Sequence, residues 1–151
     1  MKTLKTYLIV LLSVMAFSSC STDKTMIAKG VNLNKYEYAS LVQTKNGFGT
    51  TTDIELEPGI YDAIESTRLS MVGDRRIDDL SSDQKGKLVL AKYSATSNEN
   101  GSTLSISFED YMTGKTVASC RASSKGAWTR QRDVDRAIRK LAGRIEKVWG
   151  K

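Results

Sequence analysis

The chain has 151 residues, of which 40% are hydrophobic and 26% are charged, proportions that are ordinary for a globular protein. It contains no histidine and two cysteines, which excludes zinc sites of the familiar spacings and removes the usual general base at neutral pH. The formal net charge is +6 at pH 7, but residues 21–114 carry 10 basic and 14 acidic side chains, whereas residues 115–151 carry 11 and 3. This basic C-terminal quarter indicates either an acidic partner or a solvated helix face.

The first 19 residues have the pattern of an export signal. Lys2 and Lys5 provide a positively charged start, and the apolar segment that follows spans residues 7–17. That segment is too short to cross a bilayer, which takes about 20 apolar residues. Its length is typical of a cleaved signal peptide.

The tetrapeptide at residues 17–20, Phe-Ser-Ser-Cys, resembles the lipobox of bacterial lipoproteins, with phenylalanine where leucine is usual. The resemblance implies that residues 1–19 are removed and that Cys20 carries palmitate as the new amino terminus. The attached lipid would then hold the protein at a membrane. Alternatively, an ordinary signal peptidase cuts after Ser18, which would leave a protein without lipid and Cys20 free to pair with Cys120.

After the signal, the sequence predicts a tether and one domain. Residues 20–34 are polar and mixed, and we expect them to form a lipidated tether. A tether of this length reaches at most about 50 Å, so a partner would have to lie near the membrane. Residues 35–151 are expected to form a single domain with its own core.

The first half of the domain contains patterns for both strands and helices. Aromatic and β-branched residues predict strands at 35–43 and 68–72. Pro58 suits the first turn of a helix, where its missing N–H is not needed, and predicts a short helix over 58–66. The Ser-x-x-Gln pattern that begins at Ser81 has the form of a capping box and predicts a helical turn directly after it.

Three consecutive strands are expected in the second half of the domain, at 87–96, 102–110 and 115–123. In the middle strand Leu104, Ile106 and Phe108 alternate with serine and threonine, which predicts one buried face and one wet face. Small residues on the third strand would let a helix pack closely on the sheet. Cys120 lies among them, and we interpret it as a small buried group rather than a reactive thiol.

A long helix is expected over 128–149. Its apolar residues recur at steps of three and four and therefore form one stripe: Val134, Ile138, Leu141, Ile145 and Val148. The opposite side, which we call the basic helix face, carries Arg132, Arg136, Arg139, Lys140 and Lys147. Together these elements predict a two-layer α+β fold. A mostly antiparallel sheet of about five strands would carry the short helix and the long C-terminal helix on one face.

Three segments, at 71–80, 104–119 and 134–145, resemble elements of one superfamily of envelope proteins. The match in the second segment rests on Asp110 followed by the Thr-Gly-Lys turn that starts at Thr113. The superfamily includes the curli-secretion lipoproteins, the penicillin-binding-protein activator lipoproteins and the amino-terminal domain of the translocation protein TolB. The resemblance implies this fold and an accessory role. A pore is not expected, because the sequence lacks the alternating membrane strands that a pore needs.

We therefore expect a membrane-anchored envelope lipoprotein that acts as a non-catalytic interaction or accessory module in cell-envelope or secretion assembly. Its expected location is the outer membrane, facing the periplasm or the cell surface. The expected binding surface is the basic helix face. The expected partner is an acidic envelope protein or an anionic envelope polymer rather than nucleic acid, and no cofactor or metal ion is expected.

Two other classes of protein stay open. A small-ligand carrier, or an enzyme with an unrecognised site, would need a deep cleft such as one lined by Asp74, Arg75 and Tyr93. An assembly subunit would instead pair its edge strands with copies of itself. The aspartates of residues 74–83 lack the spacing of a calcium-binding loop.

Overall fold

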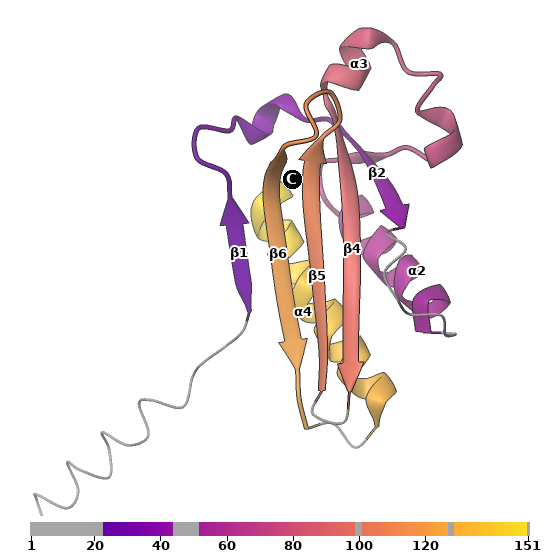
Figure 1. Cartoon of the computed structure of the whole chain (residues 1–151), viewed down its shortest axis with the longest axis vertical. Coiled ribbons are helices and arrows are strands. Elements are labelled where there is room, and N and C mark those ends of the chain that lie inside the picture. Colours follow the sequence, from indigo (N-terminus) through magenta and orange to yellow (C-terminus); the bar gives the residue numbers. More distant parts are fainter. Residues whose placement is uncertain (1–22, 44–51, 99–100, 127–128, 151) are drawn as a thin grey trace, which may run out of the picture.

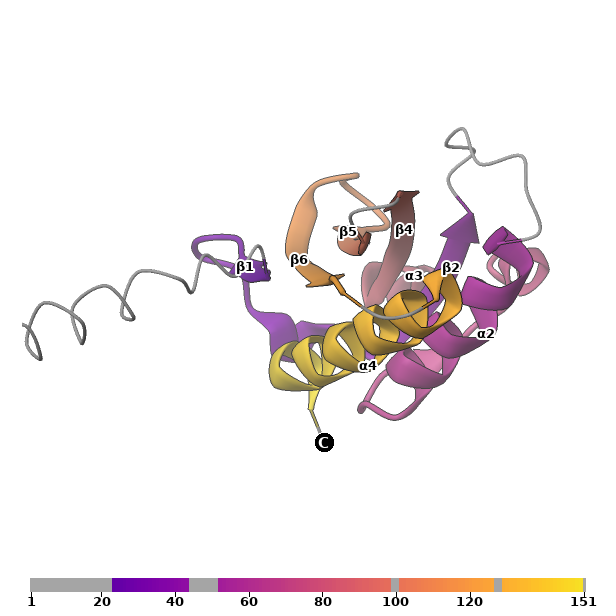
Figure 2. The same ribbon diagram turned by 90° about the horizontal axis from the view of Figure 1, so that it is seen from below.

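The computed structural model describes residues 23–43, 52–98, 101–126 and 129–150. These residues form one six-stranded sheet with the strand order β1-β6-β5-β4-β2-β3. The two longer helices, α2 and α4, cover one face of the sheet, and the other face is open (Figure 1, Figure 2). The predicted two-layer α+β fold is therefore confirmed, with one strand more than expected.

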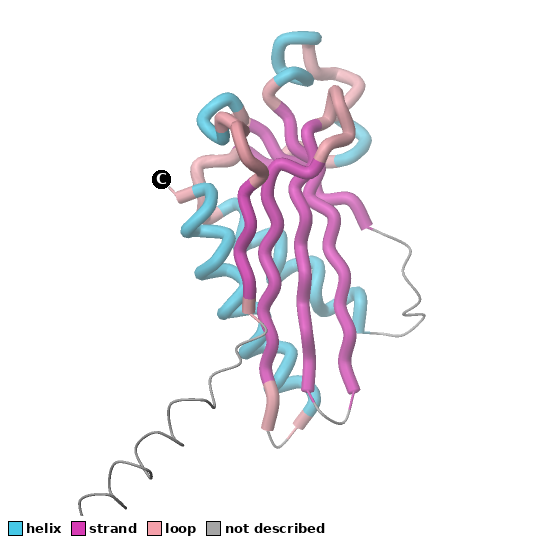
Figure 3. Tube along the Cα trace, turned by 60° about the vertical axis from the view of Figure 1, so that its left-hand side comes forward, coloured by secondary structure: helices cyan, strands magenta, loops and turns pink. Residues whose placement is uncertain are grey.

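The sheet combines an antiparallel half with a parallel half, and Figure 3 shows its strands side by side in front of the helices. β4, β5 and β6 form two antiparallel hairpins, and β1 pairs antiparallel with β6 at one edge. β2 runs parallel to β4 and to the short edge strand β3, so α2 is the crossover between β2 and β3. The strands are β1 Lys24–Ile27, β2 Tyr38–Gln43, β3 Ser70–Met71, β4 Leu88–Asn98, β5 Gly101–Asp110 and β6 Thr116–Ser124. The helices are η1 Leu33–Lys35, α2 Thr52–Glu65, η2 Asp74–Arg76, α3 Ser82–Gly86 and α4 Arg130–Trp149.

The alternation predicted for the second half of the domain is confirmed. Leu104, Ile106 and Phe108 are buried beneath α4, whereas the residues between them lie on the open face. Phe108 packs edge-on against Trp149 of α4, with 5.1 Å between the ring centroids. The Trp149 ring also meets Tyr36 at 6.0 Å, so the end of α4 holds the segment before β2 against the sheet.

The long C-terminal helix begins at Arg130, because the Thr129 side chain caps it by accepting a hydrogen bond from the Arg132 N–H. The expected start at Trp128 lies outside the described residues. The predicted apolar stripe faces the sheet and α2, and it gains Ala137 and Trp149, which are also buried. α4 crosses α2 at Gly59, where an added Cβ would lie 3.1 Å from Ile138 Cγ2. Glycine at this position therefore permits the close approach of the two helices.

The position of the first helix differs from the prediction. α2 begins at Thr52, so Pro58 lies inside the helix rather than in its first turn. The apolar face explains the difference, because Leu56 is buried one turn before Ile60 and extends that face towards the amino terminus. The missing N–H of Pro58 removes one hydrogen bond of the helix. The predicted capping box is confirmed, since Ser81 and Gln84 bond each other's backbone N–H groups.

The expected tether is also corrected by the structure. Lys24–Ile27 forms β1 and pairs with β6 instead of extending away from the domain. A strand of four residues at a sheet edge has too little alternation to be seen in the sequence, and it is held by a partner that lies far along the chain. The folded part of the protein thus includes Asp23, three positions after Cys20. Cys20 itself lies outside the described residues.

Candidate functional site

The basic helix face is largely exposed. Because the opposite stripe of α4 is buried against the sheet, Arg132, Arg136, Arg139 and Lys147 project to the solvent side of the helix. Among the described residues, no carboxylate lies within ion-pair distance of these four side chains. The structure therefore places four of the five predicted residues on one solvated surface.

Lys140, the fifth residue of that face, has structural contacts. Its Nζ donates a hydrogen bond to the Ser123 carbonyl at 2.8 Å and lies 3.9 Å from the Asp23 carboxylate. Arg144, which the sequence did not single out, lies 3.4 Å from the same carboxylate and 3.4 Å from the Thr25 hydroxyl. Lys140 and Arg144 thus join α4 to the edge of the sheet.

Asp23 is the centre of this junction. Its carboxylate accepts a hydrogen bond from the Ser123 N–H at 2.7 Å. Burial opposes ionisation of the carboxylate, but this hydrogen bond and the charges of Lys140 and Arg144 outweigh it and hold the pKa of Asp23 below its usual range. The contacts fix the start of β1 to both β6 and α4. No sequence signal pointed to Asp23, because its partners Ser123, Lys140 and Arg144 all lie 100 or more positions further along the chain.

A second junction explains the Asp-turn pattern of the hairpin. The Asp110 carboxylate, which is buried, accepts hydrogen bonds from Lys35 Nζ, from the Tyr36 hydroxyl and from the Thr113 N–H, each at 2.8 Å. Burial disfavours its charged form, yet these three donors lower the pKa of Asp110 far below its ordinary value. Burial, together with the bond to this carboxylate, raises the pKa of Tyr36 to about 12. The turn itself needs Gly114, which has a φ of 66°.

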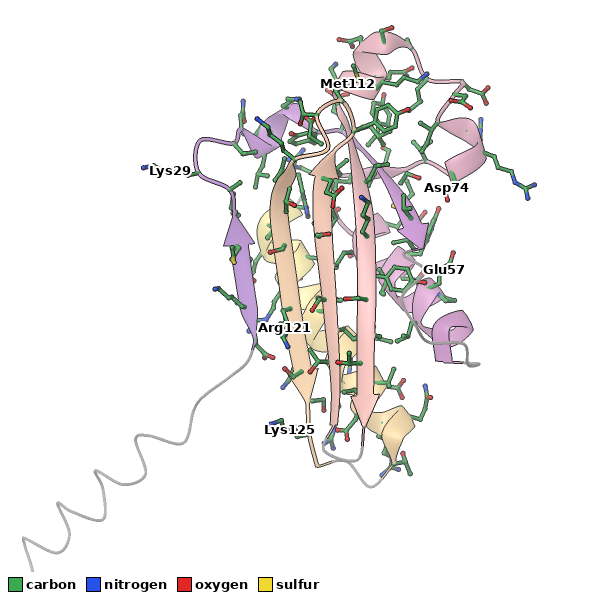
Figure 4. All side chains as sticks on the ribbon, in the orientation of Figure 1. Lys29, Glu57, Asp74, Met112, Arg121 and Lys125 are labelled. Atoms are coloured by element: carbon green, nitrogen blue, oxygen red, sulfur yellow. The ribbon has the colours of Figure 1, made fainter. Side chains whose placement is uncertain are left out.

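The cleft that would favour a carrier or an enzyme is not formed as expected. Asp74 and Arg75 line a depression of about 430 Å³ beside β2, β3 and α2, but Tyr93 is buried in the core instead. Asp74 accepts a hydrogen bond from the Ser40 hydroxyl at 2.8 Å. Figure 4 shows Asp74 and Glu57 at this side of the molecule. The lining residues are Leu41, Glu57, Tyr61, Met71, Val72, Gly73, Asp74, Arg75 and Arg76.

Cys120 has the environment predicted for it. The side chain is 1% exposed and faces α4 among small residues of β6. Burial raises the pKa of the Cys120 thiol to about 11, although the Thr25 hydroxyl and Arg144 act in the opposite direction. The interpretation of Cys120 as a buried structural group is confirmed.

The described part of the chain contains neither a metal-binding cluster nor a membrane-spanning helix. No group of three or more acidic or cysteine side chains within it is arranged to hold a metal ion. No helix within the described ranges is both long and apolar enough to cross a bilayer.

Comparison with known proteins supports the fold and nothing finer. No protein-family profile matches the chain, and no curated protein matches it in sequence. Two structures of PelC dodecamers from Paraburkholderia phytofirmans, one of them a point variant, do match. The variant is 9% identical at a TM-score of 0.50 and covers 82% of this chain and 98% of its own. The other is 8% identical at a TM-score of 0.51, with coverages of 87% and 99%.

A third solved structure is a neuraminyllactose-binding hemagglutinin homolog from Helicobacter pylori. It is 14% identical at a TM-score of 0.39, and covers 80% of this chain and 82% of its own. At 8% and 9% identity, the two PelC structures show a likeness of fold alone. The resemblance to the curli-secretion, activator and TolB proteins stays a prediction.

Proposed function

We propose that this protein is an envelope lipoprotein, anchored at Cys20, that acts as a non-catalytic interaction or accessory module in cell-envelope or secretion assembly. Its proposed location is the outer membrane, on the periplasmic side or the cell surface. The lipobox-like tetrapeptide at residues 17–20 carries this proposal. The folded domain includes Asp23, only three positions after Cys20, which suits a module that works close to a bilayer.

The proposed binding surface is the basic helix face, and the proposed partner is an acidic envelope protein or an anionic envelope polymer. The four exposed cations of α4 support this choice, because none of them is used to hold the described part of the fold. Lys140 takes part through its surface position but has contacts of its own with β6. Binding through exposed charges is screened by salt, so capture should weaken steeply as ionic strength rises.

Two measurements test the proposal. Metabolic labelling with a palmitate analogue should mark the wild-type chain and leave the Cys20→Ala variant unmarked. Crosslinking in intact cells should then recover a partner with the wild type, and charge reversal in the Arg136→Glu/Arg139→Glu variant should abolish that capture. The matched control is Arg75→Glu/Arg76→Glu, which reverses two exposed arginines on another surface. Equal capture by both variants would rule out the helix face as the binding surface.

Self-assembly is a second candidate function, and one observation favours it. β1 is an edge strand, and two of its residues, Met26 and Ile27, are apolar and each 52% exposed. Open edges of this kind pair with other chains. The structural neighbours from Paraburkholderia phytofirmans are dodecamers, which is compatible with assembly of this chain. Light scattering of the detergent-solubilised protein, compared with Ile27→Lys, measures whether β1 forms an oligomer.

A small-ligand carrier or an enzyme has weaker support. The depression near Asp74 is open, and the charged side chains around it are exposed. Ligand pockets generally bury most of the ligand surface, which this depression does not do.

A further inference from the structure

A second group of basic side chains lies on the open face of the sheet. Lys24 of β1 and Arg121 of β6 are direct partners in the strand register, and both are exposed. Lys125 follows one residue after the end of β6 and is also exposed. Figure 4 shows Arg121 on β6 next to the start of β1, and Lys125 further along, at the end of β6. We call these three residues the edge cluster.

The fold does not account for the edge cluster. Like charges directly opposite each other on neighbouring strands are destabilising. Within the described residues, none of the three cations has a carboxylate within ion-pair distance. Lys92 on the same open face shows the usual arrangement, because it is paired with Glu109. The edge cluster is therefore suited to binding an anion.

The position of the cluster indicates which anion. Asp23 accepts a hydrogen bond from Ser123 and forms ion pairs with Lys140 and Arg144. These contacts hold the start of β1 on the sheet. Three residue steps separate Asp23 from Cys20, and a fully extended chain covers about 11 Å over that length. If Cys20 carries lipid, the membrane surface must lie within this distance of Asp23. Lys24 is the next residue and Arg121 is its strand partner, so in that case the cluster would lie close to the headgroup region.

We propose that Lys24, Arg121 and Lys125 bind the phosphate groups of anionic phospholipids in the leaflet that holds the Cys20 anchor. This inference rests on the proposed function, since it requires the lipid at Cys20. It assigns the open sheet face to the membrane and leaves the basic helix face, on the other side of the sheet, for a protein or polymer partner. Docking would fix the orientation of the domain, which a lipid anchor by itself does not do.

The magnitude of the effect follows from the charge. Each basic residue near an anionic membrane surface contributes about a fivefold preference for the bound state. Neutralising two of them should lower the ratio of docked to undocked domain by about 25-fold. Reversing their charge should lower it further.

The test uses the full acylated protein in vesicles. A Met26→Cys substitution introduces a labelling site on β1 that is exposed, whereas Cys120 is buried and Cys20 would be acylated. A fluorophore there reports contact with lipids that carry a quencher on the headgroup. We expect strong quenching in vesicles of phosphatidylethanolamine and phosphatidylglycerol, and weak quenching at high salt or in phosphatidylcholine alone.

Variants separate the two basic surfaces. Lys24→Gln/Arg121→Gln should reduce quenching in the anionic vesicles towards the level seen in phosphatidylcholine, and Lys24→Glu/Arg121→Glu should reduce it further. Arg136→Glu/Arg139→Glu is the matched control and should leave quenching unchanged. Circular dichroism checks that each variant is folded.

The outcomes are distinct. Quenching that is independent of lipid charge, or that is lost in the helix variant and kept in the edge variant, would overturn the inference. Capture of an acidic protein by the edge cluster without headgroup quenching would overturn it as well, and would assign the cluster to a protein partner. If palmitate labelling fails at Cys20, the proposed function fails and the inference with it. If labelling succeeds and quenching does not respond to the edge variant, only the inference fails.

Discussion

Replacing Asp110 with asparagine tests whether the buried carboxylate holds the hairpin turn to the segment before β2. The carboxylate has three donors at 2.8 Å: Lys35 Nζ, the Tyr36 hydroxyl and the Thr113 N–H. Asparagine has a similar shape but no charge, so it weakens all three bonds. It also replaces one acceptor oxygen of the carboxylate with an NH2 group, which can only donate.

The cost can be worked out bond by bond. The Lys35 side chain is 46% exposed, so its contribution is small, at most about 1 kcal/mol. The Tyr36 hydroxyl is buried, and weakening its bond costs about 1–3 kcal/mol. Adding about 1 kcal/mol for the Thr113 N–H, we expect the free energy of unfolding to fall by about 3 kcal/mol.

Urea unfolding of the purified mature protein measures this loss. Asp78→Asn is the matched control, because Asp78 is exposed and its side chain makes no ion pair with a described residue, so its free energy of unfolding should change by less than about 0.5 kcal/mol. The double variant Tyr36→Phe/Asp110→Asn should be less destabilised than the sum of its single variants, since both remove the same bond. A loss below about 1 kcal/mol for Asp110→Asn, or strict additivity in the cycle, would refute the role assigned to this carboxylate.

Four further predictions concern the core and the titrating groups. Trp149→Ala should lower the free energy of unfolding by about 3–5 kcal/mol in urea titrations, because the fully buried ring packs against the sheet. Cys120 should react with a thiol reagent at pH 8 at least about 100-fold more slowly in the native protein than in urea, since its raised pKa leaves little thiolate; equal rates would contradict its burial. The folded-state pKa values of Asp110 and Asp23 are lowered, so the unfolded chain binds more protons, and the stability they provide above about pH 4 should be lost as the pH falls below that value. The pKa of Tyr36 is raised instead, so its effect on stability has the opposite pH dependence. The stability that Tyr36 provides is complete below about pH 10 and should disappear as the pH rises towards 12. A Tyr36→Phe variant should therefore show a flatter alkaline limb in thermal melts.

Local periodicity was enough to predict most of the fold. The alternation around Ile106 identified the hairpin strands and their buried face, and the spacing from Val134 to Ile145 identified the long helix and its packing side. Both signals work because a strand repeats every two residues and a helix every 3.6, so the pattern is contained within the element. The sequence predicts a start for α2 that is too late, because Pro58 suits a first turn, whereas the buried Leu56 continues the same face one turn earlier.

The site was predictable only in part, for the same reason. The sequence identified the basic side of α4, since its charges recur within one helix. It gave no sign of the edge strand β1, which is four residues long and has its partner about a hundred positions later. The role of Asp23 and the partial use of Lys140 in holding that strand were equally hidden, because an ion pair between distant residues leaves no local pattern.

By itself, the amino-acid sequence determined the expected cellular location, the class of the fold and the two faces of the main strands and of the last helix. Each of these depends on residues that are neighbours in the chain. The tertiary structure decided where the chain enters the domain and which basic residues lie beside that point. Pairing β1 with β6 brings Lys24 next to Arg121, and the contacts of Asp23 keep it there. Such proximity arises from strand pairing and long-range contacts, which only the folded chain creates.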